Sequence, residues 1–573
     1  MLRFRTLAPL GALTFLPMAL AAQGAMNGST AAAAPAPLPL KYSGPPTSAP
    51  ISAGDLMTRL YIFADDSMMG REAGTPAHMK ATAYIASQVE KLGLVPAGDN
   101  GTYFQNVPFI SRRFDPNTTL TVDGGSLVGI TDFVAAPFRG AVPRALDGVQ
   151  AVYGGTLGDT AHAITAEQAA GKLVVLSGAG NNMVRITPAS PLAHAAAVAV
   201  VIGPQLGAAQ LAAGRTASFT LKPAANAPAV PVTLFVTRAG AERLLGASLD
   251  GLAVGAAGKT VQGNLRYIEA PAPTRNVVAV LPGADARLKG EYVAVGAHSD
   301  HIGLRAAGPV DHDSLHLYNA KRWFATENPT GARLTPEQQQ QMQARIAGIQ
   351  LNYDSVHAAR PARRDSINNG ADDDGSGTVT VLEVAEAFAK GRVKPKRSIL
   401  FVWHTGEEKG LLGSRYFTDN PTVPRDSIVA QINIDMVGRG AARDLAAGSD
   451  RYLQLVGSRR LSTELGDLTE AVNKTEPAPF AFDYTFDANG HPENIYCRSD
   501  HYNYARYGIP VVFLTTGLHG DYHQVTDEPQ YIDYPHMARV GQFVFDLTKR
   551  VADLDHRPVV DKPKPDPNGA CRQ

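Results

Sequence analysis

Residues 292–300 read Tyr-Val-Ala-Val-Gly-Ala-His-Ser-Asp, an apolar stretch that ends in a histidine and an aspartate. Continuous apolar runs of this kind are typical of strands that are covered on both faces of a sheet. Four similar runs occur at 277–281, 399–403, 432–434 and 511–514, and helical apolar spacing occurs at 378–390 and 536–550. The pattern predicts an α/β fold with a mixed, mostly parallel central sheet flanked by helices.

Polar side chains gather where these predicted strands end. In an open α/β sheet, ligands bind in the crevice beyond the carboxyl ends of the strands, so side chains that are distant in the sequence meet there. Five clusters have this placement or follow shortly after a run: His298-Ser-Asp300, Asp372-Asp-Asp374, Glu407-Glu408, Asn433-Ile-Asp435 and Asp521-Tyr-His523.

The residue types in these clusters point to a metal site. Three consecutive acids at 372–374 repel one another, and a bound cation relieves that repulsion, whereas a helix cap needs only one of them. Adjacent Glu407 and Glu408 point in different directions, so one can bind metal while the other faces an attacking water. His298 needs an acceptor for its second ring N–H, and the Asp300 carboxylate can supply it. Together the five clusters predict a site for two divalent cations.

Each cluster alone also has a simpler explanation. A histidine after a strand is often a hydrogen-bonded loop residue, and acids often cap helices. His519 competes with His523 for a ligand role, and His301 has no better claim than a loop histidine. The residues 311–313 and His316 could bind an additional cation, but the sequence favours a solvated loop there.

Length and composition bound the class of protein. The chain has 573 residues, of which 44% are hydrophobic and 18% charged, which predicts a globular protein with more than one domain. Lys plus Arg and Asp plus Glu both number 53, so no net field favours nucleic acid, and net neutrality is compatible with a monomer or a dimer. The only cysteines are Cys497 and Cys571, whose pairing the sequence leaves open, so a thiolate metal cage is excluded.

The first residues have the pattern of a secretory signal. Arg3 and Arg5 precede an apolar stretch at 6–20, and small residues follow at 19–21. The stretch is shorter than the roughly 20 apolar residues that span a bilayer, and no cysteine is near it, so a membrane anchor is not expected. We predict a signal peptide over 1–22 and a secreted or periplasmic protein.

The rest of the chain divides by composition. An Ala-, Pro- and Ser-rich lead-in at 23–50 predicts a flexible linker. The main domain is predicted over 51–147 and 263–555, with an insertion at 304–365 that includes a polar helix near 336–350. Residues 148–262 predict a small β-rich α/β module without a catalytic cluster, and the Pro-rich residues 556–573 predict a disordered tail.

On these residues the sequence resembles metallopeptidase family twenty-eight, the secreted bacterial and fungal zinc aminopeptidases with a co-catalytic metal pair. The resemblance covers 276–550 and the stretch 65–105. The module at 148–262 resembles a protease-associated domain. The resemblance implies a zinc exopeptidase fold, two Zn²⁺ per chain, a peptide substrate and a peptidase domain formed by the two main segments.

The resemblance also assigns the five metal ligands. It implies that His298 and Asp435 hold one zinc, that Glu408 and His523 hold the other, and that Asp373 bridges them.

The remaining roles come from the same resemblance. Glu407 would be the general base, Asp300 the acid behind the first histidine, and Tyr522 a group that polarises the substrate carbonyl. The Asp373–Asp374 peptide bond would be cis. Arg498, Ser499 and Asp500 resemble a loop near the substrate pocket, where Asp435 would also contact substrate. The insertion at 304–365 departs from the shortest family members.

Three alternatives stay open at this point. A glutaminyl cyclase-like acyltransferase has this fold with a single zinc, and the complete five-ligand set argues against it. A non-catalytic binding protein on the same scaffold is expected to lose ligands, and none is lost. A carboxypeptidase or a dipeptidase of the same fold is poorly distinguished, because loops build the specificity pocket.

Overall fold

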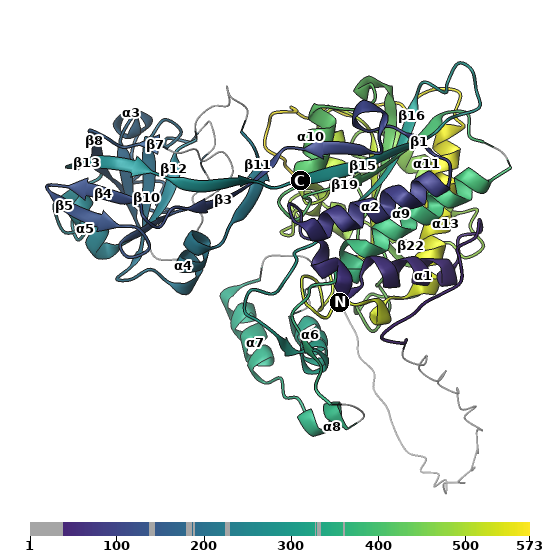
Figure 1. The fold of residues 1–573 in the computed structure, drawn as a ribbon, viewed down its shortest axis with the longest axis horizontal. Coiled ribbons are helices and arrows are strands. Elements are labelled where there is room, and N and C mark those ends of the chain that lie inside the picture. Colours follow the sequence, from purple (N-terminus) through teal and green to yellow (C-terminus); the bar gives the residue numbers. More distant parts are fainter. Residues whose placement is uncertain are drawn as a thin grey trace, which may run out of the picture. The chain divides into compact units, whose positions relative to one another are not determined.

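The computed structural model describes residues 38–136, 144–178, 186, 190–223, 230–326, 328, 334–358, 361–392 and 394–573. The predicted signal peptide at 1–22 lies outside the described residues, as does most of the predicted linker. From residue 40 onward the chain contains two nine-stranded sheets, each with its own helices (Figure 1). The last linker residues are held by hydrogen bonds: the Ser48 backbone N–H donates to Asp55 and the Thr47 hydroxyl donates to Glu386.

The sheet that carries the candidate site is mixed, as predicted. Its strand order is β1 (Val95–Pro96), β15 (Thr274–Leu281), β19 (Ser398–His404), β16 (Tyr292–His298), β20 (Ile428–Ile434), β23 (Val511–Thr515), β21 (Tyr452–Val456) and β22 (Ala481–Asp483), with β2 (Phe104–Val107) also paired to β15. The neighbouring strands β19, β16, β20 and β23 are parallel, whereas β15 and β21 join them in antiparallel fashion. Parallel pairing therefore occupies the centre, and the five predicted apolar runs fall on β15, β16, β19, β20 and β23.

Helices cover both faces of this sheet. On one face, Phe417 of α10 (Leu412–Asp419) and Tyr504 of α12 (His501–Ala505) join one apolar cluster with Val402 and Val511 of the strands. The helices α1 (Ala53–Phe63), α2 (Pro76–Lys91), α9 (Gly377–Lys390) and α13 (Tyr534–Ala552) lie together in Figure 1, and α9 and α13 contact β16. α9 is buried along most of its length, and its two buried glutamates, Glu383 and Glu386, form ion pairs with Arg59 of α1.

The second sheet belongs to the β-rich module. Its order is β5 (Gly125–Val128), β4 (Thr119–Val122), β13 (Ala257–Leu265), β8 (Val149–Thr156), β9 (Leu173–Ser177), β10 (Ala197–Gly203), β12 (Val232–Thr237) and β6 (Phe133–Ala135), with β7 (Arg144–Ala145) paired to β13. A three-stranded sheet is formed by β11 (Ser218–Leu221), β3 (Phe109–Phe114) and β14 (Tyr267–Pro271).

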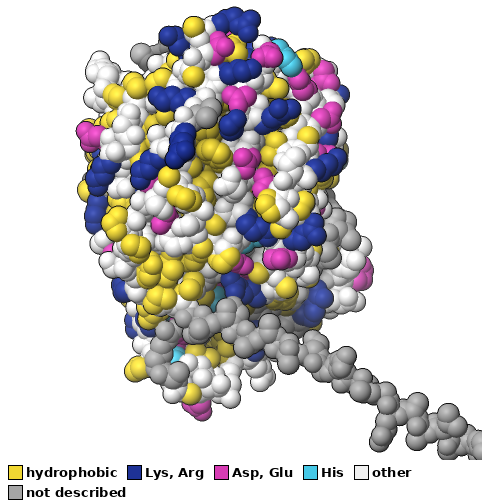
Figure 2. All heavy atoms as spheres, turned by 90° about the vertical axis from the view of Figure 1, so that its right-hand side faces the viewer, with side chains coloured by type: hydrophobic (Ala, Val, Ile, Leu, Met, Phe, Trp, Pro, Cys, Tyr) yellow, Lys and Arg dark blue, Asp and Glu magenta, His cyan; other side chains and the backbone are white. Residues whose placement is uncertain are grey.

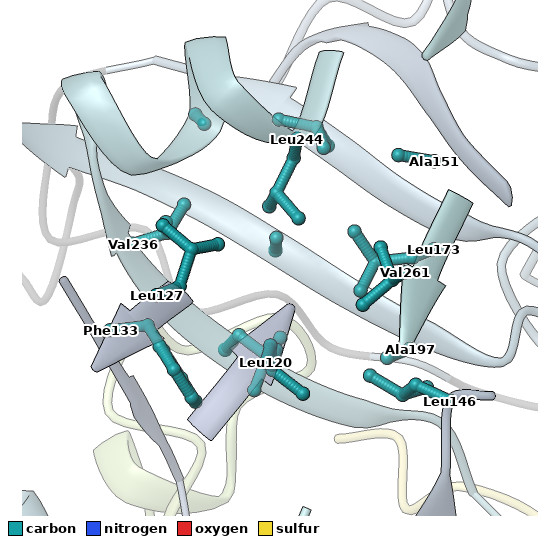
Figure 3. Packing of buried hydrophobic residues seen from close by; sticks show 14 of the residues in the cluster. Leu120, Leu127, Phe133, Leu146, Ala151, Leu173, Ala197, Val236, Leu244 and Val261 are labelled. Carbon is teal, nitrogen blue, oxygen red and sulfur yellow. The ribbon is translucent and has the colours of Figure 1, made fainter. Parts of the chain in front are cut away.

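The module begins earlier than the predicted boundary at residue 148. β4 pairs with β13 and β6 pairs with β12, so the strands at 119–135 are part of it. Figure 3 shows Leu120, Leu127 and Phe133 packed with Leu173 of β9 and Leu244 of α5 (Arg238–Leu245) in a single apolar core. These early strands are three or four residues long, which is too short for a periodic signal in the sequence.

The predicted insertion is a helical lobe closed by a short antiparallel pair. β17 (Val310–Asp311) pairs with β18 (Arg364–Asp365), and between them lie α6 (His312–Thr326), α7 (Pro336–Ala347) and α8 (Tyr353–His357). α7 coincides with the predicted polar helix and buries none of its described residues.

The C-terminal segment differs from the predicted disordered tail. The Val559 backbone N–H donates to Glu464, and the Asp561 carboxylate accepts the Thr463 backbone N–H at 2.9 Å. Cys571 forms a disulfide with Cys497. The Pro-rich composition disfavours regular secondary structure. The segment is nevertheless bound to the domain by these hydrogen bonds and by the disulfide.

Figure 2 shows the right-hand face of Figure 1, on which Lys and Arg side chains are interspersed with Asp and Glu side chains. This mixture agrees with the equal numbers of basic and acidic residues in the sequence. Within the described residues, none of the helices combines the length and apolar character that crossing a lipid bilayer requires.

Candidate active site

The five sequence clusters meet at the carboxyl ends of the four parallel strands. His298 ends β16, and Asp435 directly follows β20. Glu408 follows β19, His523 follows β23, and Asp373 lies in the irregular turn (Ala371–Ser376) that leads into α9. Because neighbouring parallel strands end at the same edge of a sheet, residues more than 200 positions apart come together.

Asp373 lies between two histidines. His298 Nε2 is 3.1 Å from Asp373 Oδ1 and 3.6 Å from Asp435 Oδ1. His523 Nε2 is 3.0 Å from Asp373 Oδ2 and 3.0 Å from Glu408 Oε2. The two oxygens of one carboxylate thus face two different sets of donors, which is the arrangement that a bridging ligand between two cations requires.

The donor atoms in this cluster fit divalent cations. His301, Asp373, Glu408 and His523 offer atoms within 4.8 Å of one another, as do His298, Asp374 and Asp435. Asp373 Oδ2, Glu408 Oε1 and His523 Nε2 are buried atoms without a hydrogen-bond partner among the described residues. Burying such groups costs free energy unless an ion or a partner binds them, and mixed imidazole and carboxylate donors suit zinc.

His301 is a member of the cluster that the sequence did not single out. Its Nδ1 lies 2.8 Å from Glu408 Oε1 and 3.7 Å from Asp373 Oδ2. Its position three residues after His298, on the same strand end, is the signal that could have identified it. His519, the competitor of His523, lies outside both groups, with its Nε2 3.2 Å from Asp372 Oδ2.

The charges in the cluster are arranged as imidazole–carboxylate pairs. Burial alone would lower the pKa of His523, but the close contacts with the Asp373 and Glu408 carboxylates outweigh burial and raise the pKa to about 10. Burial would raise the pKa of Asp373, but the close contacts with His298 and His523 hold it well below its ordinary value. Protons on the imidazoles therefore balance the carboxylates, and metal binding at this cluster would release those protons.

Asp374 holds three segments of the site together. Its Oδ1 accepts the backbone N–H groups of Gly377 at 2.9 Å and Met436 at 3.1 Å, and its Oδ2 accepts that of His298 at 3.1 Å. The Asp373–Asp374 peptide bond is cis, as the family resemblance implies. The Asp374 oxygens are thus engaged by backbone donors, which favours a structural role beside Asp373.

Asp527 holds the same turn through hydrogen bonds to its backbone, a role that the sequence analysis did not predict. Its carboxylate accepts the backbone N–H groups of Asp372 and Asp373, each at 3.0 Å. The side chain is fully buried. An acid four residues after His523 was a weak signal in the sequence, because nothing there indicates that the loop folds back onto the turn.

Asp300 has a different contact from the one predicted. His298 Nδ1 lies 3.0 Å from the backbone carbonyl oxygen of Asp300, while the Asp300 carboxylate is 3.8 Å away. That carboxylate instead accepts the backbone N–H of Glu407 at 3.1 Å. The backbone folds back on His298, so the side chain is free to hold the loop after β19, and Asp300 orients Glu407.

An open cavity lies beside the cluster. Glu407, Asp373 and Asp435 form its polar end, and its apolar lining comes from Met436, Phe486, Ile495, Phe513 and Leu518. Burial and the neighbouring charges of Glu408 and Asp435 hold the pKa of Glu407 well above its ordinary value, against an opposing effect of His298.

The predicted substrate-contacting residues separate into two groups. Ser499 Oγ donates to Asp435 Oδ2 at 2.6 Å, Arg498 Nη2 donates to the Tyr522 hydroxyl at 3.3 Å, and all of these residues line the cavity. Asp500 is buried, and burial raises its pKa to about 7, but it is not part of the cavity lining. The structure therefore places Arg498, Ser499 and Tyr522 beside the cluster and Asp500 behind it.

Comparison with known proteins gives a family match for the segment that carries most of the site. Residues 352–548 match the model of Peptidase family M28. The family resemblance is confirmed for this segment, which includes Asp373, Glu407, Glu408, Asp435 and His523.

Curated relatives match the chain over a similar length. The chain is 28% identical over 214 residues to leucine aminopeptidase 1 of Ajellomyces capsulatus, covering 34% of this chain and 52% of that protein. It is 32% identical over 211 residues to leucine aminopeptidase 1 of Aspergillus fumigatus, covering 32% of this chain and 51% of that protein. The chain thus spans about half the length of the curated relatives that it matches.

Solved structures resemble the chain at low identity. An aminopeptidase from Aneurinibacillus sp. strain AM-1 has 16% identity and a TM-score of 0.46, covering 90% of this chain and 97% of that chain. BSAP, a zinc aminopeptidase from Bacillus subtilis, has 17% identity and a TM-score of 0.42, covering 87% and 95%.

Proposed function

We propose, from the premise that residues 352–548 form a Peptidase family M28 domain, that this chain is a zinc-dependent aminopeptidase that removes N-terminal residues from peptides. The observation that carries the proposal is the position of Asp373, whose two oxygens face His298 and His523. The names of the curated relatives, leucine aminopeptidases, favour the same activity.

Five residues would hold two zinc ions. His298 and Asp435 would bind one ion, Glu408 and His523 the other, and Asp373 would bridge them. His301, 2.8 Å from Glu408, is an additional donor on the second side. When bound, the ions supply Lewis acidity, which lowers the pKa of a nearby water and polarises the scissile carbonyl.

Glu407 would act as the general base. It lines the cavity beside the ligand cluster, and Asp300 fixes its backbone. Its carboxylate takes the proton of the attacking water and delivers a proton to the leaving amine. The Tyr522 hydroxyl, which accepts a hydrogen bond from Arg498, donates its own proton in a hydrogen bond to the carbonyl oxygen as charge develops there.

The cavity would select the substrate. A free ammonium group finds the carboxylates of Glu407 and Asp435 at the polar end, which favours an unblocked N-terminus. The walls formed by Met436, Phe486 and Phe513 favour a large apolar side chain on the first residue.

Export from the cytoplasm belongs to the same proposal. The charged and apolar pattern over residues 3–21 is that of a secretory signal. The Cys497–Cys571 disulfide supports export, because disulfides persist in oxidising compartments and are rare in the cytosol.

A panel of chromogenic amides tests the activity. Leucyl and phenylalanyl amides should be hydrolysed faster than lysyl and aspartyl amides, and N-acetylated forms should be resistant. A chelator should abolish hydrolysis and added zinc should restore it. Equal rates for free and blocked amides would overturn the aminopeptidase proposal, release of C-terminal residues would indicate a carboxypeptidase, and pyroglutamate as product would indicate a cyclase.

A further inference from the structure

A second group of metal-ligand residues lies where the helical insertion joins the main domain. His312 is the first residue of α6, Asp365 ends β18, and Glu528 lies in the loop five residues after His523. A ring nitrogen of His312 and carboxylate oxygens of Asp365 and Glu528 all lie within 4.8 Å of one another. The two groups of donors in the candidate active site meet the same separation.

The histidine in this group is buried with an unpartnered nitrogen. His312 is 0% exposed, and its Nε2 has no hydrogen-bond partner among the described residues. Glu528 is 6% exposed, and Asp365 is partly buried. Burying a polar nitrogen without a hydrogen-bond partner costs free energy. This nitrogen therefore points to a bound ligand, independently of the two neighbouring carboxylates.

An acceptor on the far side of the imidazole makes available the tautomer with a free lone pair on Nε2. His312 Nδ1 lies 3.2 Å from Asp313 Oδ1, so an Nδ1–H can donate to that carboxylate. The His312 backbone N–H donates to the Arg363 carbonyl at 2.9 Å, and the ring stacks on Tyr531 with 13° between the planes. A carboxylate behind an imidazole fixes the tautomer that binds metal through the other nitrogen.

Arg363 is the cation that balances these acids in the absence of a metal. Without a metal its Nη2 donates to His312 Nδ1, which requires the ring proton on Nε2, and the same Nη2 lies 4.0 Å from Asp313 Oδ1. A cation bound at Nε2 requires the other tautomer, in which Nδ1–H donates to Asp313. The positive charge of Arg363 does not fully compensate the carboxylates. Burial, together with the neighbouring charge of Asp365, raises the pKa of Glu528 to about 8, although Arg363 acts to lower it. Two carboxylates that repel in a buried place favour a cation between them.

We propose that His312, Asp365 and Glu528 bind a third divalent cation, separate from the candidate active site, that fastens the insertion at 304–365 to the loop after His523. One imidazole and two carboxylates suit Zn²⁺ rather than Ca²⁺ or Mg²⁺, which prefer oxygen ligands alone. Three protein ligands leave a position for water. The cation joins both ends of the insertion to a loop that also carries Asp527, so the metal would order the insertion against that loop. This proposal does not depend on the peptidase activity.

Zinc content measures the site directly. The full chain is incubated with excess zinc chloride, separated from free ion by gel filtration and analysed for zinc per chain by atomic emission. The wild type should retain one equivalent more than Glu528→Gln or Asp365→Asn, both near-isosteric changes. Glu337→Gln, at an exposed position of α7 in the same insertion, is the matched control and should retain the wild-type amount.

A crystal of the zinc-loaded wild type gives a second measurement that does not depend on how the variants fold. Diffraction at the zinc edge should place an anomalous peak between His312, Asp365 and Glu528. Zinc should also slow trypsin cleavage within 304–365 in the wild type and in Glu337→Gln, but not in Glu528→Gln. Equal zinc content in the wild type and both site variants, or a crystal with no peak at this position, overturns the proposal.

Discussion

Asp527 Oδ2 accepts the backbone N–H of Asp373 at 3.0 Å, directly behind the carboxylate that faces both histidines. The same carboxylate accepts the N–H of Asp372. Asp527 therefore fixes the backbone of the turn from which the candidate bridging ligand projects. A residue in this position controls where the carboxylate of Asp373 lies without touching a metal itself.

Replacement of Asp527 by Asn should weaken zinc binding by about 10- to 100-fold, because the amide NH₂ that replaces one oxygen cannot accept the Asp372 N–H, which lies 3.0 Å from both Asp527 oxygens. Competition with a chromophoric zinc chelator measures the affinity. Asp450→Asn changes the same type of side chain at an exposed position and should leave the affinity unchanged. Wild-type zinc affinity in Asp527→Asn would show that the turn holds Asp373 without this support.

The adjacent glutamates should respond differently to the same substitution. Glu407→Gln should retain the bound zinc and lower kcat by about a hundredfold or more, because the amide cannot accept a proton from water. Glu408→Gln should lose zinc, since Glu408 Oε2 lies 3.0 Å from His523 Nε2 at the second ligand position. Zinc analysis and initial rates on a leucyl amide separate the two effects, and unchanged turnover in Glu407→Gln would remove it from the general-base role.

The sequence was sufficient to predict the sheet and the cluster of ligand candidates, because both depend on local patterns. Apolar runs identified the five strands β15, β16, β19, β20 and β23, and polar residues at or after their ends identified the five ligand clusters. Parallel strands then bring such ends together whatever the details of the loops.

The features that were missed depend on how loops fold back. The direction of the Asp300 side chain, toward Glu407 rather than His298, follows from the backbone path after β16. The support of Asp373 by Asp527 and the meeting of His312 with Glu528 join segments more than 150 residues apart in the sequence. No periodicity in a single sequence records contacts of that kind.

The disulfide between Cys497 and Cys571 should contribute measurably to stability. It joins residues 74 positions apart, and closing a loop of that length in the unfolded chain corresponds to about 4 kcal/mol in the chain-entropy model. Cys571→Ser should lower the thermal midpoint by several degrees. A reducing agent should lower the midpoint of the wild type to the same extent and leave that of Cys571→Ser unchanged; an equal effect of the reductant on both proteins would contradict this assignment.

Buried neutral histidines should make the fold sensitive to acid. His78 is buried between the hydroxyls of Ser299 and Thr274, each 3.1 Å from a ring nitrogen, and burial lowers its pKa to about 3. Burial has the same effect on His404 and His501. In the unfolded chain these groups titrate near their ordinary pKa of about 6.5, so the unfolded state binds more protons between about pH 3 and 6.5. The contribution of these three histidines to stability therefore rises with pH in that window and is lost as pH drops below about 6.5.

His501→Leu isolates one of these histidines, because the ring of His501 stacks on Phe513 in an apolar setting where leucine can substitute. The wild type should lose about 1.4 kcal/mol more stability than this variant between pH 7.5 and 5.5. Over this range the His501 imidazole takes up a proton in the unfolded state but not in the folded state. Urea unfolding of both proteins in the presence of a chelator measures the difference.

His523 contributes to the pH dependence with the opposite sign, since its pKa is raised in the ion-free fold. This contribution is common to both proteins, so it cancels in the comparison. His194→Gln, at an exposed position, is the control and should match the wild type at both pH values. If His501→Leu loses as much stability on acidification as the wild type, the His501 imidazole already carries its proton in the folded state.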